Sequence, residues 1–219
     1  MSYPKWQRLL ERMLSDEKLP LAALAYYIQK DALKFGDFTF ASGIKSNNKF
    51  ELELLPKIAY NLATKILVDI IGKDKPDAVF GVPNGGNPIA YRVATRLKVP
   101  FIQTYKRDSK FFVNPDSPLI NGRVYGFEDA MTSGGSFLVA RNAVIEHANK
   151  NGYSISVPKA YAMVRRMEFD PDSRLKAEGV DLSYIYTTRD ILGWMMYFYT
   201  AGIIRRLDQK LNELWLPDL

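Results

Sequence analysis

The sequence predicts an α/β fold, a doubly wound and mainly parallel sheet flanked by helices. From Pro76 onward, short apolar segments alternate with helical segments, which is typical of βα units. The apolar run at 77–82 has the continuous character of a strand that is buried on both faces. The 219 residues are 47% hydrophobic and 25% charged, close to globular averages, so we expect a single domain over residues 1–219.

The N-terminal third of the chain predicts helices and one short strand. Apolar residues recur at helical spacing over 6–34, where Pro20 separates two helical stretches. A short strand and turn are expected at 38–46, since this segment ends in Gly, Ser and Asn residues. Pro56 then opens a helix with one apolar face, and Gly72 marks its end.

The remaining residues predict strands and helices in alternation. We expect strands at 77–82, 100–105, 123–127, 160–164 and 181–187, and helices at 89–97, 136–149 and 202–214. Residues 191–204 carry no charge, but this stretch is shorter than the roughly 20 residues of a membrane span and predicts a buried helix. No apolar signal segment follows the start, so we expect a cytoplasmic protein with no membrane partner.

The composition excludes several kinds of chemistry. Cysteine is absent, which excludes disulfides and thiolate chemistry, and we assign no role to His147, the one histidine. The 30 basic residues exceed the 24 acidic ones, giving a net charge of +6. This balance fits either an ordinary surface or a polyanionic partner, meaning nucleic acid or a phosphorylated small molecule. No run of five basic residues occurs, which argues against nucleic acid.

A glycine-rich turn follows the first of the buried strands. Asn84, Gly85 and Gly86 lie between that strand and a predicted helix. Glycines there let backbone amides approach an anion closely, and the helix start adds positive potential. The turn is neither a Walker loop nor a dinucleotide-binding motif. It therefore fits either an anion site or a plain connection between strand and helix.

An acidic pair and a hydroxyl- and glycine-rich segment follow a later strand. Two adjacent carboxylates at a strand end repel each other unless a diol, a metal or a cation lies between them. Hydroxyls and glycines at a helix start can surround a phosphate with donors. Together they predict a site for a phosphorylated sugar, and the alternative is an acidic N-cap with a Ser/Thr/Gly turn. The residues are Glu128, Asp129, Ala130, Met131, Thr132, Ser133, Gly134, Gly135 and Ser136.

The segment 127–136 resembles the phosphoribosyl-pyrophosphate (PRPP) signature of type I phosphoribosyltransferases. Four further segments resemble the orotate phosphoribosyltransferase branch, and the resemblance extends over about residues 30–192. These segments are 32–46, 80–90, 105–110 and 164–166.

This resemblance implies a fold, an activity and partners. The fold is a type I phosphoribosyltransferase sheet with a small hood formed by about residues 1–55 and the C-terminal region. The activity is Mg²⁺-dependent transfer of phosphoribose from PRPP to a nucleobase, with orotate expected as the base and orotidine 5′-phosphate and pyrophosphate as products. Magnesium is expected to be held mainly by PRPP, and the resemblance also implies a homodimer.

The resemblance also assigns roles to residues. The acidic pair is expected to bind the ribose and 132–136 the 5-phosphate, while 84–86 bind pyrophosphate. The loop 106–122 is expected to close over the substrate. Lys110, Arg107 and Asp129 are the expected catalytic residues. Lys106 is expected on the pyrophosphate, and Arg166, Lys49 and Phe50 near the base. The alternative for the three loop cations is a solvated basic turn.

The sequence departs from the family pattern at several positions. Phe112 stands where the family has a loop histidine, and Ala41 stands where it has a base-contacting lysine. Lys49–Phe50 replaces an aromatic pair, and Asn84–Gly85 replaces Tyr-Lys. Two alternatives therefore stay open: transfer to another base, and a catalytically weak PRPP-binding regulatory protein.

Overall fold

The computed structural model describes residues 19–39 and 43–201, so Ala41 and the predicted helical segments at 6–18 and 202–214 lie outside the described residues. The chain divides into two compact units, one combining residues up to Leu62 with those from Arg189 onward and the other comprising Ala63–Thr188. The first unit contains the segments expected in the hood, and the single-domain organisation stays a prediction.

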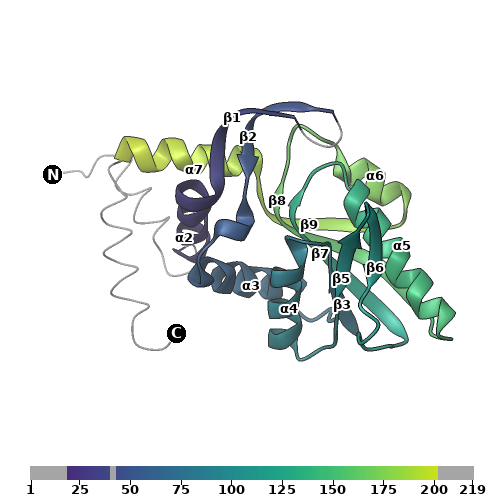
Figure 1. Ribbon diagram of the computed structural model, residues 1–219. Coiled ribbons are helices and arrows are strands. Elements are labelled where there is room, and N and C mark those ends of the chain that lie inside the picture. Colours follow the sequence, from purple (N-terminus) through teal and green to yellow (C-terminus); the bar gives the residue numbers. More distant parts are fainter. Residues whose placement is uncertain (1–18, 40–42, 202–219) are drawn as a thin grey trace. The chain divides into compact units, whose positions relative to one another are not determined.

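The second unit contains a five-stranded parallel sheet in the order β4-β3-β7-β8-β9 (Figure 1). This sheet confirms the predicted α/β class. Its strands are β3 (Ala78–Gly81), β4 (Phe101–Ile102), β7 (Gly122–Met131), β8 (Ile155–Arg165) and β9 (Asp181–Thr187). The helices between them are α4 (Gly86–Leu97), α5 (Gly135–Lys150) and α6 (Pro171–Ala177).

The strand order makes the sheet doubly wound. From β3 the chain passes through α4 to one neighbour, and from β7 it passes through α5 and α6 toward the other edge. Right-handed crossovers in opposite directions place their helices on opposite faces. Ligands of such sheets bind beyond the carboxyl ends of the strands where the direction reverses, which here is between β3 and β7.

The core of this unit lies between the sheet and its helices. All four residues of β3 are buried, as expected for a strand covered on both faces. On β7, Gly126 lies against Phe80 and Phe137, whose ring centroids are 5.6 Å apart, and a Cβ at Gly126 would come within 2.6 Å of both rings. This glycine therefore lets α5 pack closely on the sheet.

The segment predicted as the loop 106–122 is partly a β-hairpin, which corrects the sequence interpretation. Strand β5 (Thr104–Arg107) pairs antiparallel with β6 (Lys110–Val113). The connecting residues Asp108 and Ser109 both have positive φ, at 49° and 62°, as a two-residue hairpin turn requires. The predicted strand at 100–105 is likewise divided, because Gln103 separates β4 from β5.

The first unit consists of helices and a two-stranded sheet. Its elements are α2 (Leu19–Tyr27), the π-helical turn η1 (Ile28–Ala32), β1 (Leu33–Thr39), β2 (Lys45–Phe50), the 3₁₀ turn η2 (Leu52–Leu54) and α7 (Thr188–Ala201), and α3 (Lys57–Ile71) begins in it. The prediction of helix up to residue 34 was wrong, because Leu33 already pairs with Phe50 across this sheet.

Helix α7 covers most of the charge-free stretch, but it is not fully buried as predicted. Ile191 is buried, whereas Met196 is 64% exposed. Among the described helices, none combines the length and apolar character needed to cross a bilayer.

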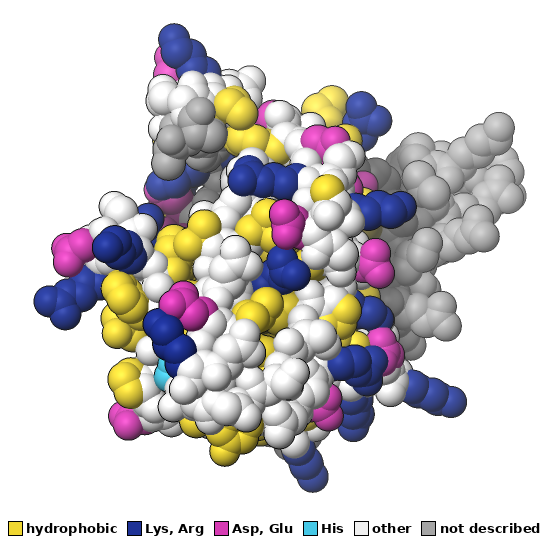
Figure 2. Space-filling view, turned by 90° about the vertical axis from the view of Figure 1, so that its right-hand side faces the viewer, with side chains coloured by type: hydrophobic (Ala, Val, Ile, Leu, Met, Phe, Trp, Pro, Cys, Tyr) yellow, Lys and Arg dark blue, Asp and Glu magenta, His cyan; other side chains and the backbone are white. Residues whose placement is uncertain are grey.

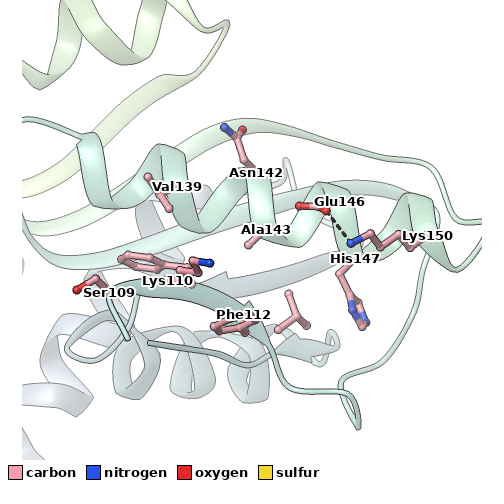
Figure 3. Close-up of a pocket in the computed structure, with 11 residues that line it drawn as sticks. Ser109, Lys110, Phe112, Val139, Asn142, Ala143, Glu146, His147 and Lys150 are labelled. Atoms are coloured by element: carbon pink, nitrogen blue, oxygen red, sulfur yellow. Dashed lines mark ion pairs between the residues drawn. The ribbon is translucent and has the colours of Figure 1, made fainter. Parts of the chain in front are cut away.

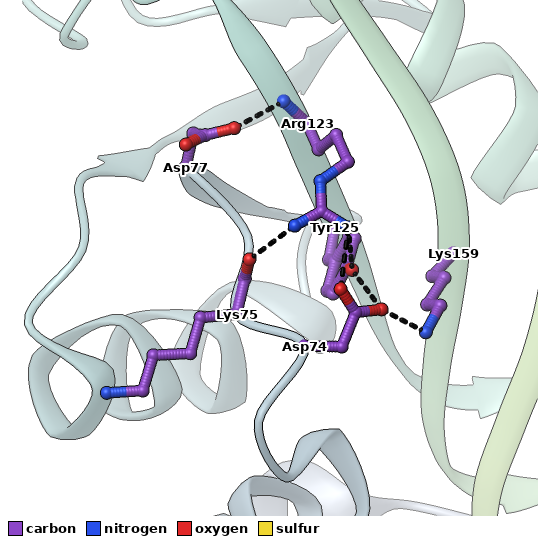
Figure 4. A network of polar contacts seen from close by, with 6 residues as sticks. All are labelled: Asp74, Lys75, Asp77, Arg123, Tyr125 and Lys159. Atoms are coloured by element: carbon purple, nitrogen blue, oxygen red, sulfur yellow. Dashed lines mark hydrogen bonds and ion pairs between the residues drawn. The ribbon is translucent and has the colours of Figure 1, made fainter.

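A network of polar contacts links the amino ends of two strands (Figure 4). Asp74 accepts hydrogen bonds from Arg123 at 2.6 Å, from Lys159 at 2.5 Å and from the Tyr125 hydroxyl at 2.9 Å. These three donors, with Lys159 first, hold the pKa of Asp74 well below its usual range. The network lies near the amino ends of the strands, whereas the switch point lies at their carboxyl ends. It therefore stabilises the fold on the side away from the candidate site.

Candidate active site

Two loops approach each other at the carboxyl ends of β3 and β7. The Val82 amide donates to the Phe127 carbonyl oxygen at 2.8 Å, and the Thr104 hydroxyl donates to the Gly81 carbonyl. These bonds position the glycine-rich turn directly beside the acidic pair. The structure therefore brings together two of the sequence-predicted loops, as the strand order requires.

The glycines of the turn are needed for this close approach. A Cβ at Gly85 would overlap the Asp129 carboxylate, and a Cβ at Gly86 would overlap the Phe127 carbonyl oxygen. The Pro83–Asn84 peptide bond is cis. Close packing explains both glycines, and their expected role in binding pyrophosphate remains a prediction.

The acidic pair lies on β7 rather than in the following loop. The strand continues to Met131, so Glu128 pairs in register with Ala162, and Met131 with Arg165. The prediction that this strand ends at residue 127 was therefore wrong. The two carboxylates are close enough for the negative charge of Asp129 to act on Glu128.

The environments of the two carboxylates differ. Glu128 is buried and its Oε2 has no hydrogen-bond partner among the described residues. Burial, with a smaller contribution from the negative charge of Asp129, raises the pKa of Glu128 to about 8. Asp129 is half-buried, and its Oδ1 accepts from the Ala130 amide at 2.8 Å. Glu128 thus has an unused acceptor, of the kind that a diol or a cation would occupy.

The start of α5 lacks an acidic cap. Its N-cap residue is Gly134, with φ 74° and no side-chain cap hydrogen bond, and its first turn holds no acidic residue. The alternative interpretation of this segment, an acidic N-cap, is therefore wrong. The first amides of a helix have no intrahelical acceptor and carry the positive end of its dipole. The predicted phosphate segment thus places Thr132 and Ser133 before a helix start that is open to an anion.

The three loop cations lie on the β5–β6 hairpin and are exposed. The Lys106 ammonium lies 5.6 Å from the centre of the Phe111 ring. Arg107 forms an ion pair with Asp108 at 3.7 Å, and the side chains of this pair are exposed. Lys110 pairs in register with Arg107 at the hairpin end. The structure thus groups these cations on one hairpin.

The hairpin and α5 enclose a groove of about 680 Å³ (Figure 3). Lys110 and Phe112 line it from the hairpin, and Val139 and His147 from α5. Phe112 also stacks on Tyr105 across the hairpin, with ring centroids 5.5 Å apart. The aromatic residue that replaces the family histidine therefore stabilises the hairpin, and the one histidine lines the same groove, which sequence reasoning missed.

Arg166 is buried and already has a carboxylate partner. Its side chain is 2% exposed, and its Nη2 lies 2.6 Å from Oε1 of Glu168. Its amide donates to the Met131 carbonyl oxygen at 2.9 Å, which places it beside the end of β7. Glu168 was missed because a carboxylate in a loop gives no local signal of pairing. Binding of a base by Arg166 stays a prediction.

Lys49 and Phe50 belong to the first unit, which is described on its own. Phe50 is buried there, and Lys49 forms an ion pair with Glu51 at 3.0 Å. Their expected contact with a base stays a prediction.

The doubly wound sheet, the acidic pair at the end of β7 and the uncapped start of α5 form the arrangement expected of a type I phosphoribosyltransferase. Among curated proteins, the chain is 30% identical over 173 residues to orotate phosphoribosyltransferase of Methanocorpusculum labreanum, covering 75% of this chain and 94% of that one. It is 27% identical over 189 residues to that of Aeropyrum pernix, covering 83% and 98%. The chain belongs to the orotate phosphoribosyltransferase family.

Solved structures agree with this placement, whereas no family model matches the chain. The crystal structure of orotate phosphoribosyltransferase from Aeropyrum pernix has a TM-score of 0.64 at 32% identity, covering 78% of this chain and 98% of that one. An adenine phosphoribosyltransferase from Thermoanaerobacter pseudethanolicus has a TM-score of 0.55 at 19% identity, covering 73% and 97%, which shows the shared fold alone.

Proposed function

We propose that this enzyme transfers the phosphoribosyl group of PRPP to orotate, giving orotidine 5′-phosphate and pyrophosphate in pyrimidine nucleotide synthesis. The observation that carries the proposal is the acidic pair at the end of β7, followed within a few residues by the uncapped start of α5. This arrangement offers acceptors for sugar hydroxyls next to donors for a phosphate.

PRPP is oriented by three groups of residues in this proposal. Glu128 and Asp129 accept hydrogen bonds from the 2- and 3-hydroxyls of the ribose. Residues 132–136 bind the 5-phosphate with amide and hydroxyl donors. Pyrophosphate binds at 84–86, where the turn already contacts Asp129.

The reaction breaks the bond between ribose C1 and the pyrophosphate oxygen and forms a bond from C1 to a nitrogen of the base. Negative charge develops on pyrophosphate as C1 becomes cationic, and Lys106, Arg107 and Lys110 stabilise that charge. Asp129 stabilises the cationic ribose. No protein base is required, since orotate is already an anion.

Magnesium is expected to bind together with PRPP, as the resemblance to the family implies. No group of three or more His, Cys, Asp or Glu residues that could enclose a metal occurs in the described part of the chain. The unpartnered oxygen of Glu128 lies in the acidic pair, beside which PRPP oxygens would hold the ion. When bound, Mg²⁺ neutralises charge on the pyrophosphate.

The proposal includes a movement of the hairpin and a homodimer. Lys110 lines the groove against α5. Closure of the hairpin over PRPP would bring its cations to pyrophosphate and exclude water. The homodimer and the cytoplasmic location are expectations of the family resemblance and of the sequence.

Binding of nucleic acid is not part of the proposal. In the space-filling view, acidic side chains are interspersed with the basic ones (Figure 2).

A base-panel assay tests the function. The protein is incubated with PRPP, Mg²⁺ and orotate, adenine, hypoxanthine or nicotinate, and pyrophosphate release is followed. We expect release with orotate alone. No release with any base, while PRPP still binds, would instead support a regulatory PRPP-binding protein.

The pairing of Arg166 with Glu168 motivates the second candidate, a transferase for another base. An orotate carboxylate must share this guanidinium with Glu168. For an orotate enzyme, Arg166→Ala should raise KM for orotate about tenfold, the effect of losing a charge-assisted hydrogen bond. KM for PRPP serves as the internal control. An equal rise in both values, or none in either, would favour the other base.

A further inference from the structure

Helix α6 lies against the start of α5. Leu175 of α6 lies beside Gly134, and Arg174 lies beside Gly135. Leu175 Cγ lies 3.2 Å from the point where a Cβ of Gly134 would be, and Arg174 Nη1 lies 3.4 Å from the corresponding point at Gly135. The Ser133 hydroxyl lies 3.5 Å from that same point at Gly135. The guanidinium of Arg174 is therefore adjacent to the phosphate segment.

The packing of α6 holds this arrangement in place. Leu175 is fully buried, and Asp170 caps the helix by accepting from the Ser173 amide at 3.2 Å. Asp172 forms an ion pair with Arg165 at the end of β8. The position of Arg174 thus follows from a buried contact and two polar contacts of its own helix.

Arg174 has no acidic partner to neutralise it. The acidic residues of the α6 region each have another partner: Asp170 accepts from the Ser173 amide, Asp172 pairs with Arg165, and Glu178 pairs with Arg141 at 3.4 Å. Within the described part of the chain, Arg174 itself has no ion pair or hydrogen bond.

Arg174 is exposed, and its guanidinium and the positive end of α5 attract an anion to the same place. The uncapped first turn of α5 and the absence of acidic residues in it leave that position without a fixed anion. A phosphate has enough acceptor oxygens to bind helix amides on one side and a guanidinium on the other. The lack of a side chain at Gly135 leaves the space between them open.

We propose that Arg174 is an additional phosphate-binding residue of this site, which binds the 5-phosphate of PRPP together with the start of α5. This inference rests on the proposed function. Arg174 contacts the end of the substrate remote from C1, so it contributes to binding and leaves the chemical step nearly unchanged.

The test measures binding of ribose 5-phosphate and of pyrophosphate by calorimetry, for the wild type, Arg174→Gln and the matched control Lys176→Gln. Both variants remove one exposed cation from α6. We expect Arg174→Gln to weaken ribose 5-phosphate about tenfold, the effect of one charge-assisted hydrogen bond. Pyrophosphate affinity should stay within twofold, and so should both affinities in Lys176→Gln.

Equal weakening by both variants, or unchanged ribose 5-phosphate affinity in Arg174→Gln, would overturn the inference. Turnover with orotate separates it from the proposed function. Normal wild-type turnover with unaffected Arg174→Gln binding refutes the role of Arg174 alone. Absent turnover with Arg174-dependent binding refutes the transferase alone, and a wild type that does not bind ribose 5-phosphate refutes both. Thermal melts establish that both variants are folded.

Discussion

Replacing Glu128 by glutamine should stabilise the protein at neutral and alkaline pH while it lowers activity. The carboxylate is buried and its Oε2 lacks a partner, so the folded state disfavours its ionisation. Its pKa is raised from 4.5 to about 8. Because the folded pKa exceeds the unfolded one, the unfolded state loses this proton first as pH rises. The presence of Glu128 therefore lowers the free energy of unfolding increasingly as the pH rises from 4.5 to about 8, and the full loss is present above pH 8.

The size of the effect follows from the pKa difference. One pKa unit corresponds to about 1.4 kcal/mol, so the change from 4.5 to about 8 sets an upper limit of about 5 kcal/mol. Glutamine keeps a polar amide in the same place, and burying an amide without partners costs about 1–3 kcal/mol. The net gain in the free energy of unfolding for Glu128→Gln should therefore be at most about 2–4 kcal/mol above pH 8, falling to zero or below near pH 5.

Urea unfolding followed by circular dichroism at pH 5, 7 and 9 measures this difference. Glu53→Gln, which removes an exposed carboxylate, is the control and should differ from wild type by the same small amount at each pH. Orotate turnover by Glu128→Gln should fall at least tenfold, because an amide donor replaces one of the two carboxylate oxygens of the proposed ribose contact. A stability difference that does not change between pH 5 and 9, or a variant less stable than wild type at pH 9, would refute the reasoning.

Three further substitutions test the network, the turn and the core. Asp74→Asn should lower Tm at pH 7, and the loss should shrink as pH falls below 3.8, because the stabilisation depends on the ionised carboxylate. Gly85→Ala should reduce pyrophosphate release at least tenfold, since its Cβ would displace the Asp129 carboxylate. Gly126→Ala should destabilise the fold by about 1–3 kcal/mol in urea unfolding, because its Cβ would overlap two aromatic rings.

Each of these substitutions has a matched control. Asp69→Asn removes a carboxylate that pairs only with exposed Lys65, at 2.8 Å, and should leave Tm nearly unchanged. Gly193→Ala adds a Cβ with no atom within 4 Å, inside α7, so activity should stay near that of wild type and stability should not fall. If a control changed Tm, activity or stability as much as the variant it accompanies, the contacts named for that variant would not be the cause of the change.

Much of the fold could be predicted because its signals are local. The apolar run of β3, and the glycine that ends α3, can be recognised from a few adjacent residues. The ends of β7 and β8 could not, because pairing with neighbouring strands extends a strand through polar residues that no local pattern marks. The hairpin at 104–113 was missed for a related reason, since neither turn residue is a glycine.

The sequence by itself determined the family and the predicted class of chemistry, because the acidic pair and the proposed phosphate segment are contiguous in the chain. Only the tertiary structure decided what surrounds them. It brought the glycine turn against Asp129, gave Arg166 a carboxylate partner, and placed Arg174 beside the start of α5. The physical reason is that contacts between residues far apart in the chain depend on strand order and helix packing. These contacts set burial, pairing and pKa.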